Sequence, residues 1–265
     1  MDLELSGKTA IVTGGSRGIG KAIARELGRE GVDVAIASRG REALEATARE
    51  LASETGRRFI PIIVDTGNEE SVQAMVQNAA TELGHLDILV NSAARVGGGP
   101  APKLAEITEE YFWEDMNTKV MGYLRCAKEV APHMQRQGWG RIINISGLAA
   151  RQSGSAVGSI RNVAVAAMTK NLADELGPLG INVTVVHPGL TRTERTAGLV
   201  EEAASRQNIT TEEAEKRMAQ NVSVGRMIDA REIAYVVAFL ASPKSVAING
   251  DAIAVAGGSG RAIHY

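Results

Sequence analysis

Short apolar runs alternate with longer amphipathic stretches along the whole chain. Parallel strands that are buried on both faces read as continuous aliphatic runs, and a helix usually makes the crossover between two of them. The pattern therefore predicts an α/β fold, a single doubly wound domain over residues 1–265, with helices on both faces of a seven-stranded, mostly parallel sheet. The expected strands are Thr9–Thr13, Val32–Ala37, Phe59–Val64, Leu86–Val90, Arg141–Ile145, Ile181–His187 and Ala252–Ala256.

A long helix is expected from about Thr108 to Gln137. It opens on Thr108-Glu109-Glu110-Tyr111, in which threonine is a good N-cap residue. The last position of this tetrapeptide is not the Glu or Gln of a complete capping box. Thr108 is thus expected to cap the helix through its own side chain.

Residues 194–220 are charged and contain no expected strand. In an open α/β sheet, an insertion after the carboxyl end of a strand lies over the ligand crevice. We expect this segment to be a lid over the substrate, and the alternative is a plain helical excursion on the surface.

The balance of charge narrows the function classes. The 29 Lys and Arg residues against 31 Asp and Glu residues give a net charge of −2, which lacks the basic footprint of a nucleic-acid-binding protein. No uninterrupted apolar run approaches the roughly 18 residues of a membrane span. Cys126 is the only cysteine, which fits a reducing compartment. We therefore expect a cytoplasmic protein without a nucleic-acid or membrane partner.

A structural or catalytic metal is not expected. The histidines are scattered along the chain, and none forms a spaced ligand pair with Cys126. They are His85, His133, His187 and His264.

A glycine-rich segment follows the first expected strand directly and precedes a helical pattern. It reads Thr13-Gly14-Gly15-Ser16-Arg17-Gly18-Ile19-Gly20. Glycines at such a turn permit tight folding, close approach of the backbone to a pyrophosphate, and close packing of helix on strand. The helix N-terminus adds unpaired N–H groups and partial positive charge. Its position between strand and helix predicts dinucleotide binding.

This turn resembles the Thr-Gly-x-x-x-Gly-Ile-Gly fingerprint of the short-chain dehydrogenase/reductase family. Further motifs resemble that family in the same order, covering about residues 5–258. They are Asp65 after the third strand, Asp87–Ala94, Pro188-Gly189 followed by Thr191 and Thr193, Val224-Gly225-Arg226, Glu232-Ile233-Ala234, Phe239-Leu240-Ala241-Ser242, and Ile248-Asn249-Gly250 before Gly257-Gly258. Ser92 and Ala94 depart from the family pattern, which has Asn and Gly there.

The resemblance implies a Rossmann fold, hydride transfer between a nicotinamide cofactor and a small carbonyl or alcohol substrate, and a homo-oligomer, either tetramer or dimer. It also implies a set of cofactor-binding residues. They are Gly14, Ser16, Arg17, Gly18, Ile19, Gly20, Ser38, Arg39, Asp65, Thr66, Asn91, Ala93, Pro188, Gly189, Thr191 and Thr193.

The end of the second strand favours NADP(H) over NAD(H). Folds that prefer NAD carry an acidic residue there for the ribose 2′-hydroxyl, whereas a nearby arginine accommodates a 2′-phosphate. Here Ser38 stands at the acidic position and Arg39 follows it. By resemblance, Arg17 also reaches this phosphate. The alternative for Arg39 is a solvated helix start, which leaves the missing acid unexplained.

The family's catalytic Tyr and the Lys four residues later are absent. Counting back from Met168–Leu176, which matches the family helix, the Tyr position holds Gly158 and the Lys position holds Asn162. No tyrosine lies between Ser146 and Lys170. The tyrosines are Tyr111, Tyr123, Tyr235 and Tyr265.

Other polar residues are candidates for the chemistry. By resemblance, Asn117 supports a water relay, and Ser146 lies at or one residue before the catalytic serine position, which otherwise falls on Gly147. Arg161 cannot donate a proton at neutral pH, but it can stabilise an oxyanion, and Asn162 can hold the nicotinamide ribose. A solvated helix start is the alternative for both. His187 is either a substrate contact or a satisfied buried histidine.

We therefore expect an NADP(H)-dependent oxidoreductase with an atypical catalytic site formed by Ser146, Asn117, Arg161 and Asn162. Without a positioned general acid, only a reactive carbonyl is expected to turn over quickly. The alternative is an NADP(H)-binding protein without redox turnover, acting as a sensor or as an inactive partner subunit. A non-redox reaction on the same scaffold, such as an elimination, is a third reading.

Overall fold

The computed structural model describes residues 1–94 and 101–260. His264 and Tyr265 lie outside the described residues. The described chain alternates strands and helices from its first strand to its last, as the apolar pattern predicts.

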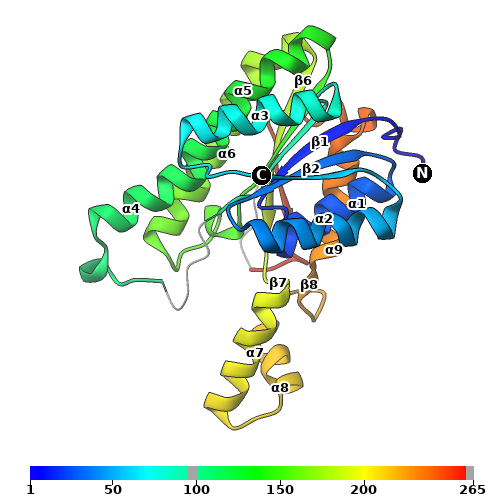
Figure 1. Cartoon of the computed structure of the whole chain (residues 1–265). Coiled ribbons are helices and arrows are strands. Elements are labelled where there is room, and N and C mark those ends of the chain that lie inside the picture. The colour runs from blue at the N-terminus through cyan, green and yellow to red at the C-terminus, as the bar shows by residue number, and fades with distance from the viewer. Residues whose placement is uncertain (95–100, 261–265) are drawn as a thin grey trace.

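Seven strands form one parallel sheet in the order β3-β2-β1-β4-β5-β6-β9 (Figure 1). They are β1 (Thr9–Thr13), β2 (Asp33–Ser38), β3 (Phe59–Ile63), β4 (Ile88–Asn91), β5 (Gly140–Ile145), β6 (Ile181–Pro188) and β9 (Ala252–Val255). The expected fold class and its strands are confirmed, with small shifts at the ends. The strand order reverses between β1 and β4, and ligands of such sheets bind at the carboxyl ends beside this switch point.

Helices cover both faces of the sheet (Figure 1). One layer contains α1 (Gly18–Arg29), α2 (Arg41–Thr55) and α9 (Ala230–Ala241), and the other contains α3 (Glu69–Leu83), α5 (Gly122–Gln137) and α6 (Ala156–Leu176). Alternate residues of β1 serve the two layers, since Val12 joins the apolar cluster of α1 and Ile11 joins that of α3. This period of two is the side-chain repeat of a strand.

The expected long helix is present but is not regular throughout. It consists of α4 (Glu109–Met116), a wider π-helical stretch η2 (Asn117–Met121), and α5. Thr108 caps α4 as predicted, because its Oγ1 accepts a hydrogen bond from the Tyr111 amide at 3.1 Å. Single π turns inside helices often occur at functional sites.

Short helical turns connect several of the main elements. They are η1 (Leu104–Glu106), η3 (Leu148–Ala150), η4 (Gly177–Leu179) and η5 (Pro243–Ser245).

Two helices project away from the body of the molecule, α7 (Glu194–Gln207) and α8 (Thr211–Met218) (Figure 1). The short strands β7 (Thr191–Arg192) and β8 (Ile228–Asp229) pair in parallel at their base. The two helices have a small apolar cluster of their own, separate from those of the sheet. It contains Val200, Ala204, Ala214, Ala219, Val222 and Met227.

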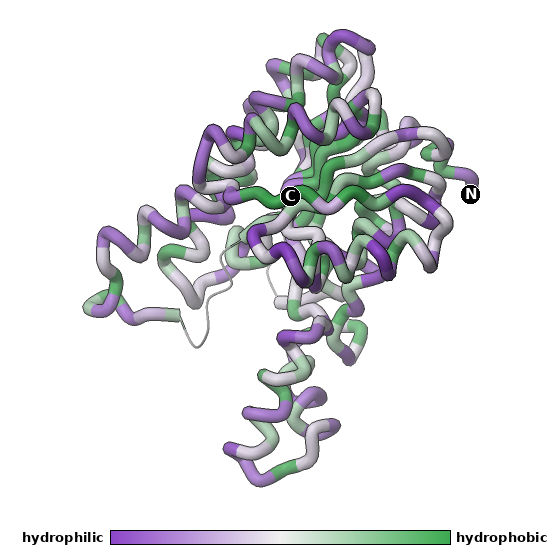
Figure 2. The backbone as a smooth tube through the Cα atoms, viewed as in Figure 1, coloured by the Kyte–Doolittle hydropathy of each residue, from purple (hydrophilic) through white to green (hydrophobic). Residues whose placement is uncertain are grey.

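The hydropathy of the chain follows these layers. Hydrophobic residues run along the central strands, and hydrophilic ones dominate the outer helices, including α7 and α8 (Figure 2). Across residues 1–94 and 101–260, no helix is both long and apolar enough to span a membrane.

Candidate active site

The glycine-rich turn is packed so tightly that there is no room for a side chain at Gly14, Gly15 or Gly20. Gly14 has φ +68, and a Cβ there would lie 2.8 Å from the Ser92 carbonyl oxygen. A Cβ on Gly20 would collide with the carbonyl oxygen of Gly14. The Gly14 amide donates to the Ala37 carbonyl at 2.7 Å, which docks the turn on β2. The turn is therefore a preformed backbone cradle at the carboxyl end of β1.

The N-terminus of α1 attracts an anion in this structure. Its N-cap residue, Arg17, is extended and makes no side-chain capping bond. Instead, the carboxylate of Glu194 accepts a hydrogen bond from the Gly18 amide at 3.1 Å. Ile19 follows directly as the second residue of the helix. A carboxylate here occupies the kind of position that a pyrophosphate takes at a helix N-terminus.

An unsatisfied hydroxyl lies at the end of β2. Oγ of Ser38 is buried and has no hydrogen-bond partner among the described residues, and Arg39 beside it is exposed. Buried polar atoms are usually hydrogen-bonded. Ser38 and Arg39 thus fit a polar ligand group such as a 2′-phosphate, and the residues of this edge fit a dinucleotide.

The loop after β3 presents the residues expected near the adenine. Asp65 is exposed, and its Oδ1 accepts a hydrogen bond from the Gly67 amide at 2.9 Å. Thr66 is buried, and its hydroxyl donates to the Thr118 carbonyl at 3.0 Å. Asn117 also serves this loop, because its amide donates to the Gly67 carbonyl at 3.1 Å.

The end of β4 is tied to its neighbours by polar contacts. Asn91 is fully buried, and its amide donates to Oδ1 of Asn144 at 2.9 Å. The Ala93 amide donates to Oγ1 of Thr13 at 3.2 Å. These bonds fix the backbone at the switch point, where the nicotinamide half of a cofactor is expected.

The segment after β6 leads from the sheet into α7. The Gly189 amide, next to Pro188, donates to the Val255 carbonyl at 3.2 Å. Thr191 donates back to the Gly189 carbonyl at 2.9 Å. Thr193 is the N-cap of α7, and its side chain accepts from the Thr196 amide. This segment therefore lies between the sheet edge and the projecting helices.

The first turn of α6 has little room at Gly158, the third residue of the helix. The hydroxyl of Ser155 caps the helix by accepting from the Gly158 amide at 3.0 Å. A Cβ on Gly158 would lie 2.8 Å from that same Oγ. A larger side chain at residue 158 would thus require Ser155 to move.

Three of the four candidate catalytic residues meet between β5 and α6. Oγ of Ser146 donates to the Asn162 carbonyl at 3.2 Å. Oδ1 of Asn162 accepts from Nε of Arg161 at 3.2 Å. Arg161 also donates from its Nη1 to both carboxylate oxygens of Asp115, at 2.9 and 2.8 Å. Asn117 does not join this group, since its side chain lies against Gly67 and Arg125.

Lys119 joins the group instead, and the sequence reasoning missed it. It lies in the π-helical stretch, is 4% exposed, and donates from Nζ to the Ser146 carbonyl at 2.9 Å. Burial lowers the pKa of Lys119 to about 7, with a further lowering from Arg161 and an opposing contribution from Asp115. The available signal was a lysine within the helix two residues after Asn117.

His187 faces the same end of the sheet from β6. It is 1% exposed, and its Nδ1 has no hydrogen-bond partner among the described residues. Burial lowers the pKa of His187 to about 4, and the positive charges of Arg151 and Lys119 add to this. The imidazole is therefore neutral at physiological pH.

Chemically, this arrangement offers one cation that can release a proton near neutral pH. The guanidinium of Arg161 stays charged and is compensated by Asp115. Burial raises the pKa of the Tyr123 hydroxyl far above its usual range. Lys119 is the remaining buried cation at the site, and its charge is not matched by a carboxylate hydrogen bond among the described residues.

The chain is similar over nearly its whole length to known reductases. The family model described as enoyl-(acyl carrier protein) reductase matches residues 14–259. The 3-oxoacyl-[acyl-carrier-protein] reductase FabG of Vibrio cholerae serotype O1 is 35% identical over 259 residues, which cover 97% of this chain and 98% of the relative. The NADPH-dependent reductase BacG of Bacillus subtilis is 30% identical over 262 residues, which cover 98% and 100%.

The crystal structure of L-sorbose reductase from Gluconobacter frateurii, complexed with NADPH and L-sorbose, is similar in fold. Its TM-score is 0.92, with 29% identity and 98% of each chain covered. Together with the ordered motifs, these matches show that the chain belongs to the short-chain dehydrogenase/reductase family.

Proposed function

We propose that this protein is an NADPH-dependent reductase of carbonyl compounds whose catalytic site departs from the family pattern. The observation that carries the proposal is the cofactor cradle at the switch point. It combines a glycine turn with no room for a Cβ at Gly14, Gly15 or Gly20, a helix N-terminus that already holds a carboxylate, and the Ser38 hydroxyl, which has no partner among the described residues. BacG is named as NADPH-dependent, and L-sorbose reductase was solved with NADPH.

The cofactor-binding roles follow the chain around this edge. The backbone of the glycine turn and of the α1 N-terminus holds the pyrophosphate. Ser38, Arg39 and Arg17 hold the 2′-phosphate, and Asp65 and Thr66 border the adenine. The remaining residues border the nicotinamide half, and they are Asn91, Ala93, Pro188, Gly189, Thr191 and Thr193. When bound, NADPH supplies the hydride.

On the substrate side, Gly158 and Asn162 take the positions of the family's Tyr and Lys. Arg161, held by Asp115, orients Asn162 through the hydrogen bond from its Nε. Asn162 in turn accepts from Ser146 through its backbone carbonyl. The side chain of Asn117 supports the loop that carries Thr66, and in this proposal it takes no part in binding the substrate. A site with these groups suits an electrophilic carbonyl, such as an α-dicarbonyl, better than a simple ketone.

Residues 194–220 form the lid of this site in our proposal. They contain α7 and α8, which follow the cofactor segment after β6 directly. A pair of helices with its own small apolar cluster can move relative to the sheet without opening the main core. The lid would close over the substrate and exclude water.

We also propose a homo-oligomer. Ile160 and Val163 lie three residues apart on α6 and are each 50% exposed. Residues three apart share one face of a helix, so these side chains form an apolar surface that a second copy can cover. Light scattering coupled to size-exclusion chromatography measures the mass in solution, and a monomer of 27.9 kDa would contradict this proposal.

Binding without turnover is the second candidate function, and one observation favours it. The polar groups of Ser146, Arg161 and Asn162 are all engaged with protein partners. Two measurements separate the two functions. The first is a calorimetric titration with NADPH and NADH. The second follows absorbance at the nicotinamide band while α-dicarbonyls, β-ketoesters, aldehydes and simple ketones are offered as substrates. The reductase proposal expects binding and oxidation of NADPH by the α-dicarbonyls first. Binding without oxidation by any compound would favour the second function, and absence of binding would contradict both.

A further inference from the structure

Lys119 is enclosed by several elements at the carboxyl edge of β5. It extends from the π-helical stretch η2, and its Nζ donates to the backbone carbonyl of Ser146 at 2.9 Å. Ser146 follows β5 directly and is itself 9% exposed. Nζ lies over the Tyr123 ring, 6.0 Å from its centroid. The ammonium group thus reaches the edge of the sheet where the substrate is expected.

The hydrogen-bonding capacity of this ammonium is not used up by the protein. A protonated lysine has three N–H donors. Over residues 1–94 and 101–260, the Ser146 carbonyl is the one acceptor within hydrogen-bond distance of Nζ. Two N–H groups therefore remain for an acceptor that the described protein atoms do not supply.

The nearest carboxylate does not compensate the charge directly. Both oxygens of Asp115 accept from Arg161, at 2.9 and 2.8 Å. A buried cation without a paired anion is unfavourable by several kcal/mol in typical proteins. Such a group persists where it has a use, and buried lysines with low pKa values are typical general acids and bases.

Other titratable and charged groups face Lys119 from each packed element. They are Asp115 of α4, Tyr123 of α5, Arg161 of α6 and His187 of β6, with Arg151 acting on His187. The pKa of Tyr123 is raised by burial, and that of His187 is lowered to about 4. Neither group exchanges a proton between pH 6 and 8, whereas burial brings the pKa of Lys119 to about 7.

We infer that Lys119 is the proton donor of this site, giving the proton from one of its two uncommitted N–H groups to the substrate oxygen during carbonyl reduction. The inference rests on the proposed reductase function. As the hydride adds to the carbonyl carbon and oxidises NADPH to NADP⁺, the π electron pair moves to oxygen. The N–H bond of Lys119 breaks, the new O–H bond forms, and the nitrogen keeps its electron pair until solvent protonates it again.

Two variants test this role. Lys119→Met keeps most of the length of the side chain and removes the charge. Its fold is expected to be as stable as wild type or more so, because no ammonium is buried. Lys119→Arg keeps the charge but cannot release a proton near neutral pH. For both, kcat on an α-dicarbonyl is expected to fall about 10²- to 10⁴-fold at pH 6.5. The dissociation constant for NADPH is expected to change less than about threefold.

The pH profile distinguishes proton donation from a structural role. Wild-type kcat/KM is expected to fall as the pH rises through about 7, because the donor must be protonated. This limb is expected to disappear in both variants. Lys128→Arg, at an exposed lysine paired with Glu69, is the matched control and should keep wild-type rates and profile.

A second readout is independent of turnover. In protein labelled with ¹³C-lysine, the Cε resonance of one residue is expected to titrate near pH 7 in the wild type and to be missing from Lys119→Arg. If no lysine titrates between pH 6 and 8, or if both variants keep wild-type kcat and the same pH limb, the inference is overturned while the reductase function stands. If wild-type protein binds NADPH but reduces no carbonyl, the proposed function fails, and the inference fails with it.

Discussion

The carboxylate of Glu194 accepts a hydrogen bond from the backbone amide of Gly18 at 3.1 Å, joining the first residue of α7 to the first residue of α1. In the proposed complex, that amide faces the cofactor pyrophosphate. An anionic side chain and an anionic ligand therefore compete for one helix end. The projecting helices and the cofactor site are coupled through this contact.

Replacing Glu194 by Gln is expected to tighten NADPH binding. The change removes the competing charge at a helix N-terminus, an interaction worth about 0.3–1 kcal/mol at an exposed site, so the dissociation constant should fall about two- to fivefold. Calorimetry at low ionic strength measures it. Glu202→Gln, on the exposed face of the same helix, is the control and should leave the constant unchanged. Equal or weaker binding by Glu194→Gln would contradict the competition.

Arg39→Ala is expected to weaken NADPH binding at least about tenfold and to leave NADH binding unchanged. A hydrogen bond to a charged group contributes about 1.5–3 kcal/mol, and only NADPH carries the 2′-phosphate. Ser38→Asp should reverse the preference, because a carboxylate repels the phosphate and accepts from the ribose hydroxyl. Titrations with both cofactors are compared with Arg41→Ala, whose guanidinium pairs with Glu45 on the surface. If Arg39→Ala weakened the binding of NADPH and NADH equally, recognition of the 2′-phosphate by Arg39 would be contradicted.

Asp115→Asn is expected to destabilise the fold by about 2–4 kcal/mol. Removing one partner of a buried ion pair leaves the other charge buried and unpaired, at a typical cost of about 3–5 kcal/mol. The Arg161 side chain retains 20% exposure, which reduces the effect. Urea unfolding gives the free energy. The surface pair Lys128–Glu69 is the comparison, and Glu69→Gln should change the free energy of unfolding far less, because an exposed pair is screened by solvent. If Asp115→Asn and Glu69→Gln changed the free energy of unfolding equally, a larger contribution from the buried Asp115–Arg161 pair would be contradicted.

The free energy of unfolding is expected to decrease as the pH falls from 6.5 toward 4. Burial lowers the pKa of His187 from 6.5 to about 4 in the folded state, so the unfolded chain binds this proton first. This contribution to the free energy of unfolding is fully present above about pH 6.5 and is lost progressively as the pH falls to about 4. At pH 5 the loss is on the order of 2 kcal/mol.

His187→Gln should flatten the dependence between pH 6.5 and 4, measured by urea unfolding at several pH values. His133→Gln is the control, because that residue is more exposed and its pKa is lowered less by burial. An unchanged slope in His187→Gln would mean that other groups cause the acid sensitivity.

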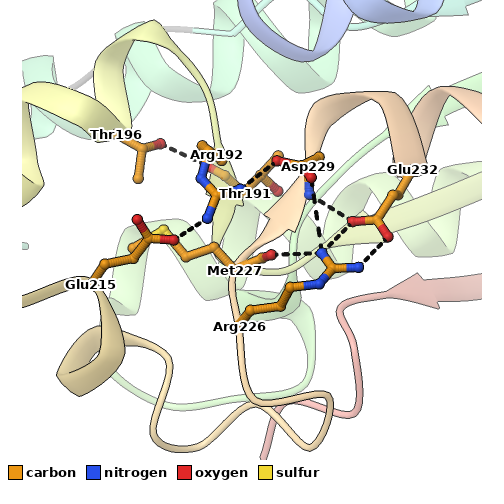
Figure 3. Close-up of polar contacts among 8 residues, drawn as sticks. All are labelled: Thr191, Arg192, Thr196, Glu215, Arg226, Met227, Asp229 and Glu232. Carbon is orange, nitrogen blue, oxygen red and sulfur yellow. Dashed lines mark hydrogen bonds and ion pairs between the residues drawn. The ribbon is translucent and has the colours of Figure 1, made fainter. Parts of the chain in front are cut away.

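Arg192 ties the base of the projecting helices together. It donates to Asp229 of β8 at 2.8 Å and pairs with Glu215 of α8, while Arg226 pairs with Glu232 beside it (Figure 3). Arg192→Ala should speed hydrogen exchange in residues 208–220 and raise KM for the substrate, while the melting temperature changes little because these pairs are exposed. Arg206→Ala, whose guanidinium pairs with Glu202 within α7, is the control. Unaltered exchange would contradict a role of Arg192 in holding the lid.

The central strands could be predicted from the sequence because burial on both faces leaves little choice of residue. Each of the seven main strands is an aliphatic run, and its position is visible without tertiary information. β7 and β8 were missed because two residues carry no periodic signal. They pair only where the chain on either side of α7 and α8 returns to the same place.

The candidate catalytic site was harder to predict, since it depends on how one helix is wound. A regular helix through residues 108–137 gave no reason to separate Asn117 from Lys119. The wider turn at Asn117–Met121 sets Asn117 against Gly67 and directs Lys119 to Ser146. Lysines on helices are usually solvated, so a buried one is invisible until the packing is known. Gly158 and Asn162, by contrast, are assigned to the Tyr and Lys positions by counting along α6, and this assignment stays a prediction.

The separate apolar cluster of α7 and α8 has an evolutionary consequence. Substitutions in Val200, Ala204 or Val222 alter a small module and leave the packing of the sheet untouched. If these helices are the proposed lid, changes there can alter substrate preference without disturbing the half of the molecule that holds the nucleotide.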